Sequence, residues 1–386
     1  MIKSWDYLNE YKFLKYKIDS SITKVLKSGT LFFGDENKKF EKNFLKINKS
    51  KYGVAVGSGT DALILSLKAL NIGINDEVIT VANTAIPTAA AIKNVGAKIK
   101  FIDVGPDYLI DVKKIQSAIT KKTKAIIPVH LYGQACEMNK IINIAKEYKL
   151  KIIEDCAQAQ GAEYDNIKVG NFGDTGCFSF YPTKIFGAYG DGGFITTNDE
   201  KIHDKVKRIR FLGMEKKKMS SGHWNGKYYA VEHGTNSRLD EVHAAILLKK
   251  FKYLDEWIER RRELAFKYDK ELKNTSLEIP AEHPDNKHAY YIYVVKHRDR
   301  DKIISELVKK DIHLNISYPW PIHIMDAYKH FECGSCNCSR KNAKFDNCNL
   351  LPETELSSKK VFSLPMYPTL TDKEQDIVIE ELKKII

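Results

Sequence analysis

A glycine-rich turn at Gly57–Ala62 (Gly-Ser-Gly-Thr-Asp-Ala) is the first of three segments whose residue types could do chemistry. Glycines let the backbone approach a ligand closely, and the free N–H groups at a helix N-terminus favour a phosphate. The spacing also satisfies the dinucleotide fingerprint G-x-G-x-x-A, with Asp76 and Glu77 about 20 residues further on. The turn therefore allows a nicotinamide enzyme, another phosphate-bearing cofactor, or simply a helix N-cap at Ser58 or Thr60.

The second segment, Ile152–Gln158 (Ile-Ile-Glu-Asp-Cys-Ala-Gln), is an apolar strand that ends in two acids. In a parallel sheet, the carboxyl ends of the strands form the edge at which such folds bind ligands. A buried carboxylate at that edge needs a partner, and a protonated heterocyclic nitrogen would serve. The alternative for Asp155 is that it caps a following helix.

The third segment places Lys184 directly after Phe178–Thr183 (Phe-Ser-Phe-Tyr-Pro-Thr) and ahead of the glycine-rich loop Gly187–Gly193. A single lysine in a loop is normally solvated. A lysine that is held in a pocket beside other positive groups can instead form a Schiff base. A phosphate cradle, a strand-end carboxylate and a pocket lysine, in this order, are the three contacts that pyridoxal phosphate requires. We therefore predict that cofactor.

Short apolar strands that alternate with helical stretches must position these segments, and they fill most of the first 250 residues. The predicted strands are Tyr52–Val56, Glu77–Val81, Ile99–Ile102, Ala125–Val129 and Lys151–Glu154, with two more between Gly176 and Thr197. The predicted helices between them are Asp61–Leu70, Thr88–Lys93 and Asn139–Lys149. Nearly continuous apolar strands separated by helices require a mostly parallel sheet that is covered on both faces. The predicted class is therefore α/β.

The pattern changes near residue 250. A long charged helix is predicted over Arg238–Lys270, and after it come a strand at Tyr290–Val295 and helices at Asp301–Lys309 and Asp372–Lys384. A chain of 386 residues is long enough for two domains. We predict a large cofactor-binding domain over residues 1–250 and a smaller α+β domain over residues 251–386.

Composition restricts the class of protein further. Hydrophobic residues make up 43% and charged residues 29% of the chain, a balance that excludes a largely disordered chain or a collagen-like fibre. No apolar run reaches the roughly 18 residues of a membrane helix, and the start, Met1–Asp6, lacks the apolar core of a signal peptide. Seven cysteines in so long a chain suggest reduced thiols. We expect a cytoplasmic protein with no membrane partner.

The net charge of +12, from 62 basic and 50 acidic residues, could indicate a nucleic-acid partner. The basic residues are instead spread along the chain beside acids, and even Arg260–Arg262 is flanked by Glu259 and Glu263. This distribution is typical of a generally basic surface, so we predict no nucleic-acid partner. Such a surface would not repel an anionic small molecule such as a nucleotide diphosphate.

The order of the motifs resembles one known family, the DegT-type, pyridoxal-phosphate-dependent nucleotide-sugar aminotransferases of the aspartate-aminotransferase fold. The resemblance covers nearly the whole chain. It runs through Gly57–Ala62, Pro128–Gly133, Glu154–Gln158, Ser179–Lys184, Gly190–Gly193, Asn236–Glu241, Tyr318–Pro319, His323 and Ser363–Pro368.

The resemblance implies a role for each matching residue at the reacting centre. Lys184 matches the lysine that bonds to the cofactor and moves the proton between the carbons of cofactor and substrate. Asp155 matches the acid that pairs with the pyridine nitrogen, raises the pKa of that nitrogen and keeps the ring an electron sink. Gln158 matches a residue that lies near the phenolic oxygen of the ring.

The remaining matches concern the phosphate, the partner subunit and the substrate. The residues that match the phosphate cradle are Gly59, Thr60 and Ser179. Asn236 matches a residue that reaches the phosphate from a second subunit, which implies a homodimer with shared active sites. Tyr318 and His323 lie where the family meets its sugar, although both could equally be packed side chains.

Two features depart from the family pattern. Many relatives stack an aromatic residue on the cofactor ring from the segment that corresponds to Asn83–Thr88, and Ala85 stands at the corresponding position here. The chain also has a stretch that looks longer than is usual, with four cysteines: Cys333, Cys336, Cys338 and Cys348. They could hold a structural zinc, or they could be reduced cysteines in an exposed insertion. Because the spacing matches zinc ribbons poorly, we assign no metal site.

The resemblance predicts an enzyme that transfers the amino group of L-glutamate to a keto-deoxysugar nucleotide. The sequences of Ala82–Thr88 and Gly234–Glu241 look most like those of relatives that aminate C-3 of a dTDP-linked 3-keto-6-deoxyhexose. The product of such an enzyme would feed polysaccharide or glycan synthesis. The nearest alternative is C-4 amination of a UDP- or dTDP-linked 4-keto sugar. An NAD-dependent dehydrogenase that uses the Gly57 loop is the alternative from another class, but it leaves Lys184 unexplained.

Overall fold

A seven-stranded sheet forms the centre of the computed structural model, which describes residues 1–215, 229–328 and 351–386. The strands run in the order β1-β9-β8-β5-β4-β2-β3. Their bounds are β1 (Tyr52–Val56), β2 (Glu77–Val81), β3 (Lys98–Ile102), β4 (Thr123–Ile126), β5 (Lys151–Asp155), β8 (Thr175–Ser179) and β9 (Gly193–Thr197). β9 is antiparallel to β1 and β8, and the other pairs are parallel. The mostly parallel sheet that the sequence predicts is confirmed.

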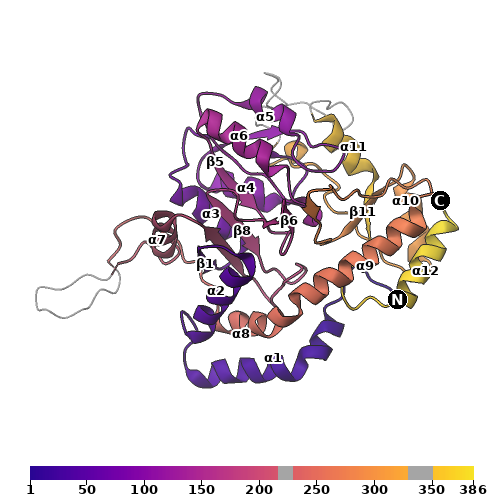
Figure 1. Cartoon of the computed structure of the whole chain (residues 1–386), viewed down its shortest axis with the longest axis horizontal. Coiled ribbons are helices and arrows are strands. Elements are labelled where there is room, and N and C mark those ends of the chain that lie inside the picture. Colours follow the sequence, from indigo (N-terminus) through magenta and orange to yellow (C-terminus); the bar gives the residue numbers. More distant parts are fainter. Residues whose placement is uncertain (216–228, 329–350) are drawn as a thin grey trace, which may run out of the picture.

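Helices cover both faces of this sheet (Figure 1) because both sets of alternating strand residues are apolar. Ile152 belongs to an apolar cluster with α2, α5, α6 and α8, whereas Ile153 belongs to a second cluster with α3, α4 and α7. The bounds of these helices are α2 (Asp35–Asn48), α3 (Gly59–Ala69), α4 (Ile86–Asn94), α5 (Val112–Ala118), α6 (Met138–Tyr148), α7 (Glu200–Ile209) and α8 (Glu241–Lys250). Within the described ranges, no helix is both long and apolar enough to cross a membrane.

A separate apolar cluster lies in the C-terminal part, which occupies the right of Figure 1 together with both chain ends. There the antiparallel pair β11 (Tyr293–Lys296) and β12 (Val361–Leu364) packs with α9 (Leu254–Leu272), α10 (Arg300–Val308) and α12 (Asp372–Lys383). The remaining elements are α1 (Leu8–Ser28), α11 (Pro352–Lys360), the 3₁₀ turns η1 (Leu131–Gly133), η2 (Phe251–Tyr253) and η3 (Ile322–Ile324), and a small sheet of β6 (Glu163–Tyr164), β7 (Ile167–Lys168) and β10 (Asn286–Lys287). The division near residue 250 stays a prediction.

Two predicted elements differ in the structure. The single helix predicted over Arg238–Lys270 is wrong, because η2 separates α8 from α9. α8 packs in the cluster beside the central sheet, and α9 then runs from that cluster, with Leu254 and Ile258, to the C-terminal cluster, with Leu264 and Tyr268. The strand predicted from Tyr290 begins only at Tyr293, because Tyr290 has a left-handed φ of 44° that a strand does not accommodate.

The four cysteines for which a zinc site was considered lie at positions 333–348, outside the described residues.

Candidate active site

The three predicted segments meet at one edge of the central sheet. β1, β5 and β8 end at this edge with Val56, Asp155 and Ser179, and the chain then turns over it. A Cβ added to Gly59 would lie only 2.7 Å from the Cβ of Ser179, so these two segments touch. The carboxyl edge of the sheet therefore brings together residues that are far apart in sequence.

The glycine turn after β1 opens helix α3 and presents its N-terminus at this edge. Ser58 is the N-cap, since its Oγ accepts a hydrogen bond from Asp61 N at 3.0 Å. The capping alternative is therefore correct for Ser58, and it leaves Gly59 and Thr60 in the first turn, where backbone N–H groups have no partner inside the helix. Only glycine fits at position 59 beside Ser179. The turn is suited to an anion such as a phosphate.

The dinucleotide alternative for this turn does not fit the topology. In the dinucleotide-binding fold, the strand before the glycine turn lies in the middle of the sheet. Here β1 is the edge strand and pairs with β9, which is antiparallel to it. Asp76, at the position expected for ribose recognition, instead accepts a hydrogen bond from the backbone of Gly73 at 3.0 Å.

Asp155 is a buried carboxylate at the end of β5. Its Oδ2 accepts a hydrogen bond from Thr88 Oγ1 at 2.8 Å, and its Oδ1 accepts one from Ala157 N at 3.2 Å. Burial raises the pKa of this carboxyl, against the effect of these bonds and of the charge of Lys184. No helix begins after Asp155, so the capping alternative for it is wrong. Among the described residues it has no ion-pair partner, which fits a ligand with a protonated ring nitrogen.

Lys184 follows β8, and its amine lies over the ring of Tyr291 with Nζ 4.7 Å from the ring centroid. Within the described ranges no carboxylate lies within ion-pair distance of Nζ, so the amine is not held by an opposite charge. The charge of Lys184 nevertheless acts on buried Asp155. An amine free of a carboxylate, beside an unpaired buried acid and a helix N-terminus, fits pyridoxal phosphate.

Gln158 and Tyr318 meet beside these groups. Tyr132 N donates to Gln158 Oε1 at 2.9 Å, and Gln158 Nε2 donates to Tyr318 OH at 2.5 Å. The rings of Tyr132 and Tyr318 stack at 6.2 Å, and both residues have a left-handed φ of 59°. Such strained conformations cluster at functional sites. The structure thus brings a predicted cofactor residue and a predicted substrate residue into direct contact.

The other predicted residues lie differently. His323 is buried and its Nε2 is 2.9 Å from Glu355 Oε1 of α11, so at least one ring nitrogen serves packing between elements. Asn236 is exposed, and its backbone pairs with Phe211. Ala85 is partly buried at the start of α4 and makes no side-chain cap. The roles assigned to His323 and Asn236 stay predictions.

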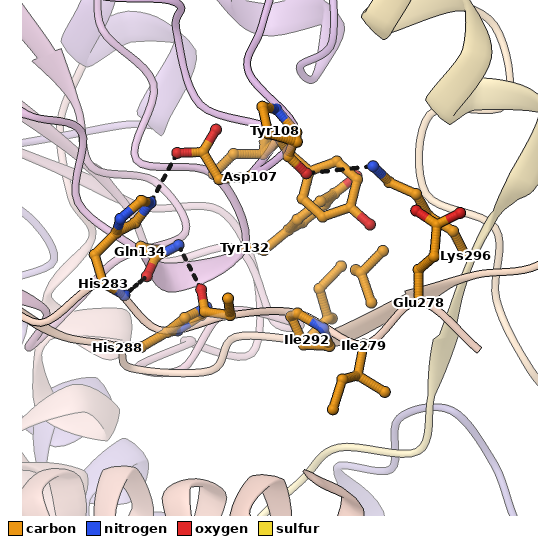
Figure 2. A pocket seen from close by; sticks show the side chains of 15 residues that line it. Asp107, Tyr108, Tyr132, Gln134, Glu278, Ile279, His283, His288, Ile292 and Lys296 are labelled. Carbon is orange, nitrogen blue, oxygen red and sulfur yellow. Dashed lines mark hydrogen bonds and ion pairs between the residues drawn. The ribbon is translucent and has the colours of Figure 1, made fainter. Parts of the chain in front are cut away.

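A cavity of about 350 Å³ borders this site, with Tyr132 in its wall (Figure 2). Its charged groups are paired within the protein. His283 Nε2 lies 2.8 Å from Asp107 Oδ2, and Lys296 Nζ lies 3.2 Å from Glu353 Oε1. None of the predicted catalytic residues lines it. The predicted reacting centre therefore lies outside this cavity.

Glu154, beside Asp155 in the sequence, is a buried structural acid that the sequence reading did not single out. Its carboxylate accepts hydrogen bonds from His130 Nε2 at 3.0 Å and from three backbone N–H groups at 2.8 Å each, those of Gly170, Phe172 and Gly173. These contacts fix the loop between β7 and β8 to the strand that carries Asp155.

Three side chains of this region, His130, Glu154 and Cys156, lie within 4.8 Å of one another and could in principle hold a metal ion. His130 Nδ1 accepts a hydrogen bond from Cys136 N at 3.1 Å, so its Nε2 carries the proton and donates to Glu154. A protonated nitrogen cannot bind a metal. The cluster is therefore structural.

Glu154→Ala should lower the free energy of unfolding by about 3–5 kcal/mol, because it leaves two buried and two half-buried donors without an acceptor. Urea unfolding of the cofactor-free variant measures this loss. The exposed Glu147 provides the control, since Glu147→Ala should change stability by less than about 0.5 kcal/mol. Equal stability of the two variants would contradict the structural role.

Comparison with known proteins agrees with this geometry. The model of the DegT/DnrJ/EryC1/StrS aminotransferase family matches residues 13–383. The chain is 41% identical to the dTDP-3-amino-3,4,6-trideoxy-alpha-D-glucose transaminase of Micromonospora megalomicea subsp. nigra, over 99% of this chain and 98% of that protein. It is 36% identical to the UDP-N-acetyl-3-dehydro-alpha-D-glucosamine 3-aminotransferase of Acidithiobacillus ferrooxidans, over 94% and 91%.

A solved structure extends the comparison to the cofactor. The chain superposes on NtdA from Bacillus subtilis, which was solved with bound pyridoxamine phosphate, with a TM-score of 0.84 and 32% identity over 96% of this chain and 81% of that one. The predicted fold, cofactor and class of enzyme are confirmed, and the dehydrogenase alternative is wrong. The chain belongs to the DegT/DnrJ/EryC1/StrS family and is a pyridoxal-phosphate-dependent nucleotide-sugar aminotransferase.

Proposed function

We propose that the protein transfers the amino group of L-glutamate to C-3 of a dTDP-linked 3-keto-6-deoxyhexose. The observation that carries the choice of carbon is that both relatives compared above have names that place the amino group at C-3. Their nucleotides differ, and the dTDP-sugar enzyme is the more similar of the two over nearly the whole chain. That similarity supports dTDP as the nucleotide.

The side chains at the sheet edge have separate tasks in this proposal. When bound, pyridoxal phosphate would supply an electron sink and would carry the amino group from one substrate to the other. The first turn of α3, with Gly59 and Thr60, and Ser179 would hold its phosphate, while the carboxylate of Asp155 would hold the ring nitrogen in its protonated form. The amine of Lys184 would move the proton between the substrate carbon that carries the nitrogen and a carbon of the cofactor.

Direct assays of candidate substrates test the proposal. The enzyme is incubated with L-glutamate and, in parallel, with dTDP-3-keto, UDP-3-keto and dTDP-4-keto sugars, and the aminated carbon is located by NMR. We expect the dTDP-3-keto-6-deoxyhexose to give the highest kcat/KM and an amine at C-3. A higher kcat/KM with a 4-keto or UDP-linked sugar would overturn the assignment. Replacing L-glutamate by L-alanine or L-glutamine tests the donor.

We also propose a homodimer in which Asn236 reaches the phosphate in the partner subunit. The exposure of this side chain on one subunit supports the proposal. If each site takes Lys184 from one chain and Asn236 from the other, then a heterodimer of Lys184→Ala and Asn236→Ala has one intact site. Mixing and refolding the two inactive variants in equal amounts should restore about a quarter of the wild-type activity.

Each variant refolded alone is the control for this experiment. Both should stay inactive or nearly so at limiting cofactor. If the mixture is no more active than the mean of the two controls, Lys184 and Asn236 act in the same chain and the shared site is wrong.

A further inference from the structure

Tyr291, in the C-terminal part of the chain, faces the proposed catalytic lysine. We propose that the ring of Tyr291 is a positioning platform that holds the amine of Lys184 in its protonated form when this amine is not bonded to the cofactor and has taken up a proton. This inference rests on the role proposed for Lys184. Its starting point is the position of Nζ over the ring, 4.7 Å from the centroid. A cation over an aromatic face within about 6 Å is attracted by the electrons of the ring.

The ring is fixed in place by contacts at both of its ends. The backbone N–H of Tyr291 donates to Tyr132 O at 3.0 Å, and its carbonyl accepts from Arg261 Nη1 at 3.0 Å. Its hydroxyl lies 3.0 Å from Thr183 Oγ1, the residue directly before Lys184. The hydroxyl contact therefore ties the platform to the lysine segment itself, so ring and lysine keep their relative position.

Arg261 makes this anchoring strong. Its guanidinium is only 2% exposed and donates to the carbonyls of Tyr290, Tyr291 and Met366 at 3.2, 3.0 and 2.9 Å. Charged donors make stronger hydrogen bonds than neutral ones. The buried arginine thus fixes the backbone of Tyr290 and Tyr291, and with it the position of the Tyr291 ring.

An aromatic face suits a lysine whose amine must alternate between a bond to the cofactor and a resting position beside the ring of Tyr291. A carboxylate within ion-pair distance would hold the ammonium firmly and compete with the reaction, and among the described residues none lies so close to Nζ. A ring attracts the cation without a directed hydrogen bond, and it gives the amine up readily. Tyr291 would therefore keep the amine near the reacting atoms without trapping it.

Chemical labelling of Lys184 tests the platform without measuring activity. Full-length protein loaded with pyridoxamine phosphate, which leaves the lysine amine free, is treated with trace acetic anhydride, and acetylation of Lys184 is followed by mass spectrometry. Exposed Lys113 is the internal reference. At pH 7.5, Tyr291→Leu should label about 3- to 10-fold faster than wild type, because loss of the ring favours the neutral, reactive amine. Tyr291→Phe keeps the ring and should label within about 2-fold of wild type.

Repeating the measurement at pH 11 separates charge from access. At pH 11 most of an ordinary lysine amine is already neutral, so the ratio of the leucine rate to the wild-type rate should fall to less than about half of its value at pH 7.5. If the ratio of the Tyr291→Leu rate to the wild-type rate is the same at pH 11 as at pH 7.5, leucine has only made Lys184 more accessible to the reagent. If the two rates are equal at pH 7.5, the ring does not hold the cation. Either result overturns the proposal. Fast acetylation of Lys184 in Tyr291→Phe also overturns the proposal, because the hydroxyl of Tyr291 and not its ring would then hold the lysine.

A second series covers the case in which the leucine variant does not fold. Fluorinated phenylalanines at position 291 keep the shape of the ring but weaken the negative potential of its face. The labelling rate at pH 7.5 should rise stepwise with the number of fluorines, and a flat series overturns the proposal.

The role proposed for Lys184, bonding to the cofactor, is tested separately in the same labelling assay. In wild-type protein loaded with pyridoxal phosphate, Lys184 should be protected from acetylation, because its amine is bonded to the cofactor. If Lys184 labels equally with both cofactor forms, the role proposed for the lysine fails. If the protection is present but the variants of Tyr291 behave alike, the platform alone fails.

Discussion

Lys184→Ala is expected to lower the rate of amino transfer by at least about 10⁴-fold, the upper end of what a positioned proton-transfer group contributes. The variant loses both the covalent link to the cofactor and the amine that moves the proton. The amine of Lys184 lies over the ring of Tyr291, and its charge acts on buried Asp155. Alanine provides no amine at this place.

An absorbance spectrum and a rate measurement check this result together. Wild-type protein should show the visible band of the lysine-bound cofactor, and L-glutamate should collapse it; Lys184→Ala should lack the band that depends on the lysine. Lys113→Ala, which removes an exposed lysine, should keep both the band and the rate. A Lys184→Ala protein with near-normal turnover would show that another group carries the proton.

The sequence singles out groups of the proposed reacting centre where each group lies in a short contiguous motif. Lys184 stands between aromatic residues and a glycine loop, and Asp155 ends an apolar strand, so both could be found without tertiary information. Strand direction then predicts where they meet, because the carboxyl ends of parallel strands share one edge. The observed sheet places Asp155 and Ser179 at that edge.

The partners of these groups could not be predicted in the same way. Thr88 bonds to Asp155 only because α4 packs over the end of β5, and nothing in the local sequence of Thr88 indicates this contact. Tyr291 reaches Lys184 because the backbone around it pairs with residues 132 and 133: Tyr291 N donates to Tyr132 O, and Ala289 N to Gly133 O. Both contacts depend on packing between segments that are more than 60 residues apart.

The difference between local motifs and long-range packing also explains why the single helix predicted over Arg238–Lys270 and the dinucleotide alternative for Gly57–Ala62 are wrong. Apolar and charged periodicity over 238–270 is compatible with one helix, and this periodicity does not indicate the 3₁₀ turn η2 that separates α8 from α9. Likewise, Gly57–Ala62 has the right letters for a dinucleotide turn, but the strand before it lies at the sheet edge. The order of the strands in the sheet decides between a dinucleotide turn and a cradle for another phosphate. A local motif does not contain information on that order.

Asp155→Asn should lower amino transfer by about 10²–10³-fold, the range found when one electrostatic contact to a reacting group is removed. The neutral amide can no longer hold the ring nitrogen of the cofactor in its protonated form. Its side chain has the same shape as aspartate; the amide oxygen can still accept from Ala157 N, and the amide NH₂ can donate to Thr88 Oγ1. The loss should therefore appear in kcat more than in protein stability.

The pH dependence of stability provides an independent measurement on the cofactor-free protein. Burial raises the pKa of Asp155, so the folded chain binds this proton more tightly than the unfolded chain does. The contribution of Asp155 to stability therefore falls as pH rises from the ordinary carboxyl range through the raised pKa. The amide in Asp155→Asn does not titrate, so the stability of this variant relative to wild type should increase over that interval. Thr88→Val, which removes a bond that favours the charged carboxylate, should make the pH-dependent loss larger. If Asp155→Asn follows the same pH profile as wild type, burial does not raise the pKa of the Asp155 carboxyl in the folded protein.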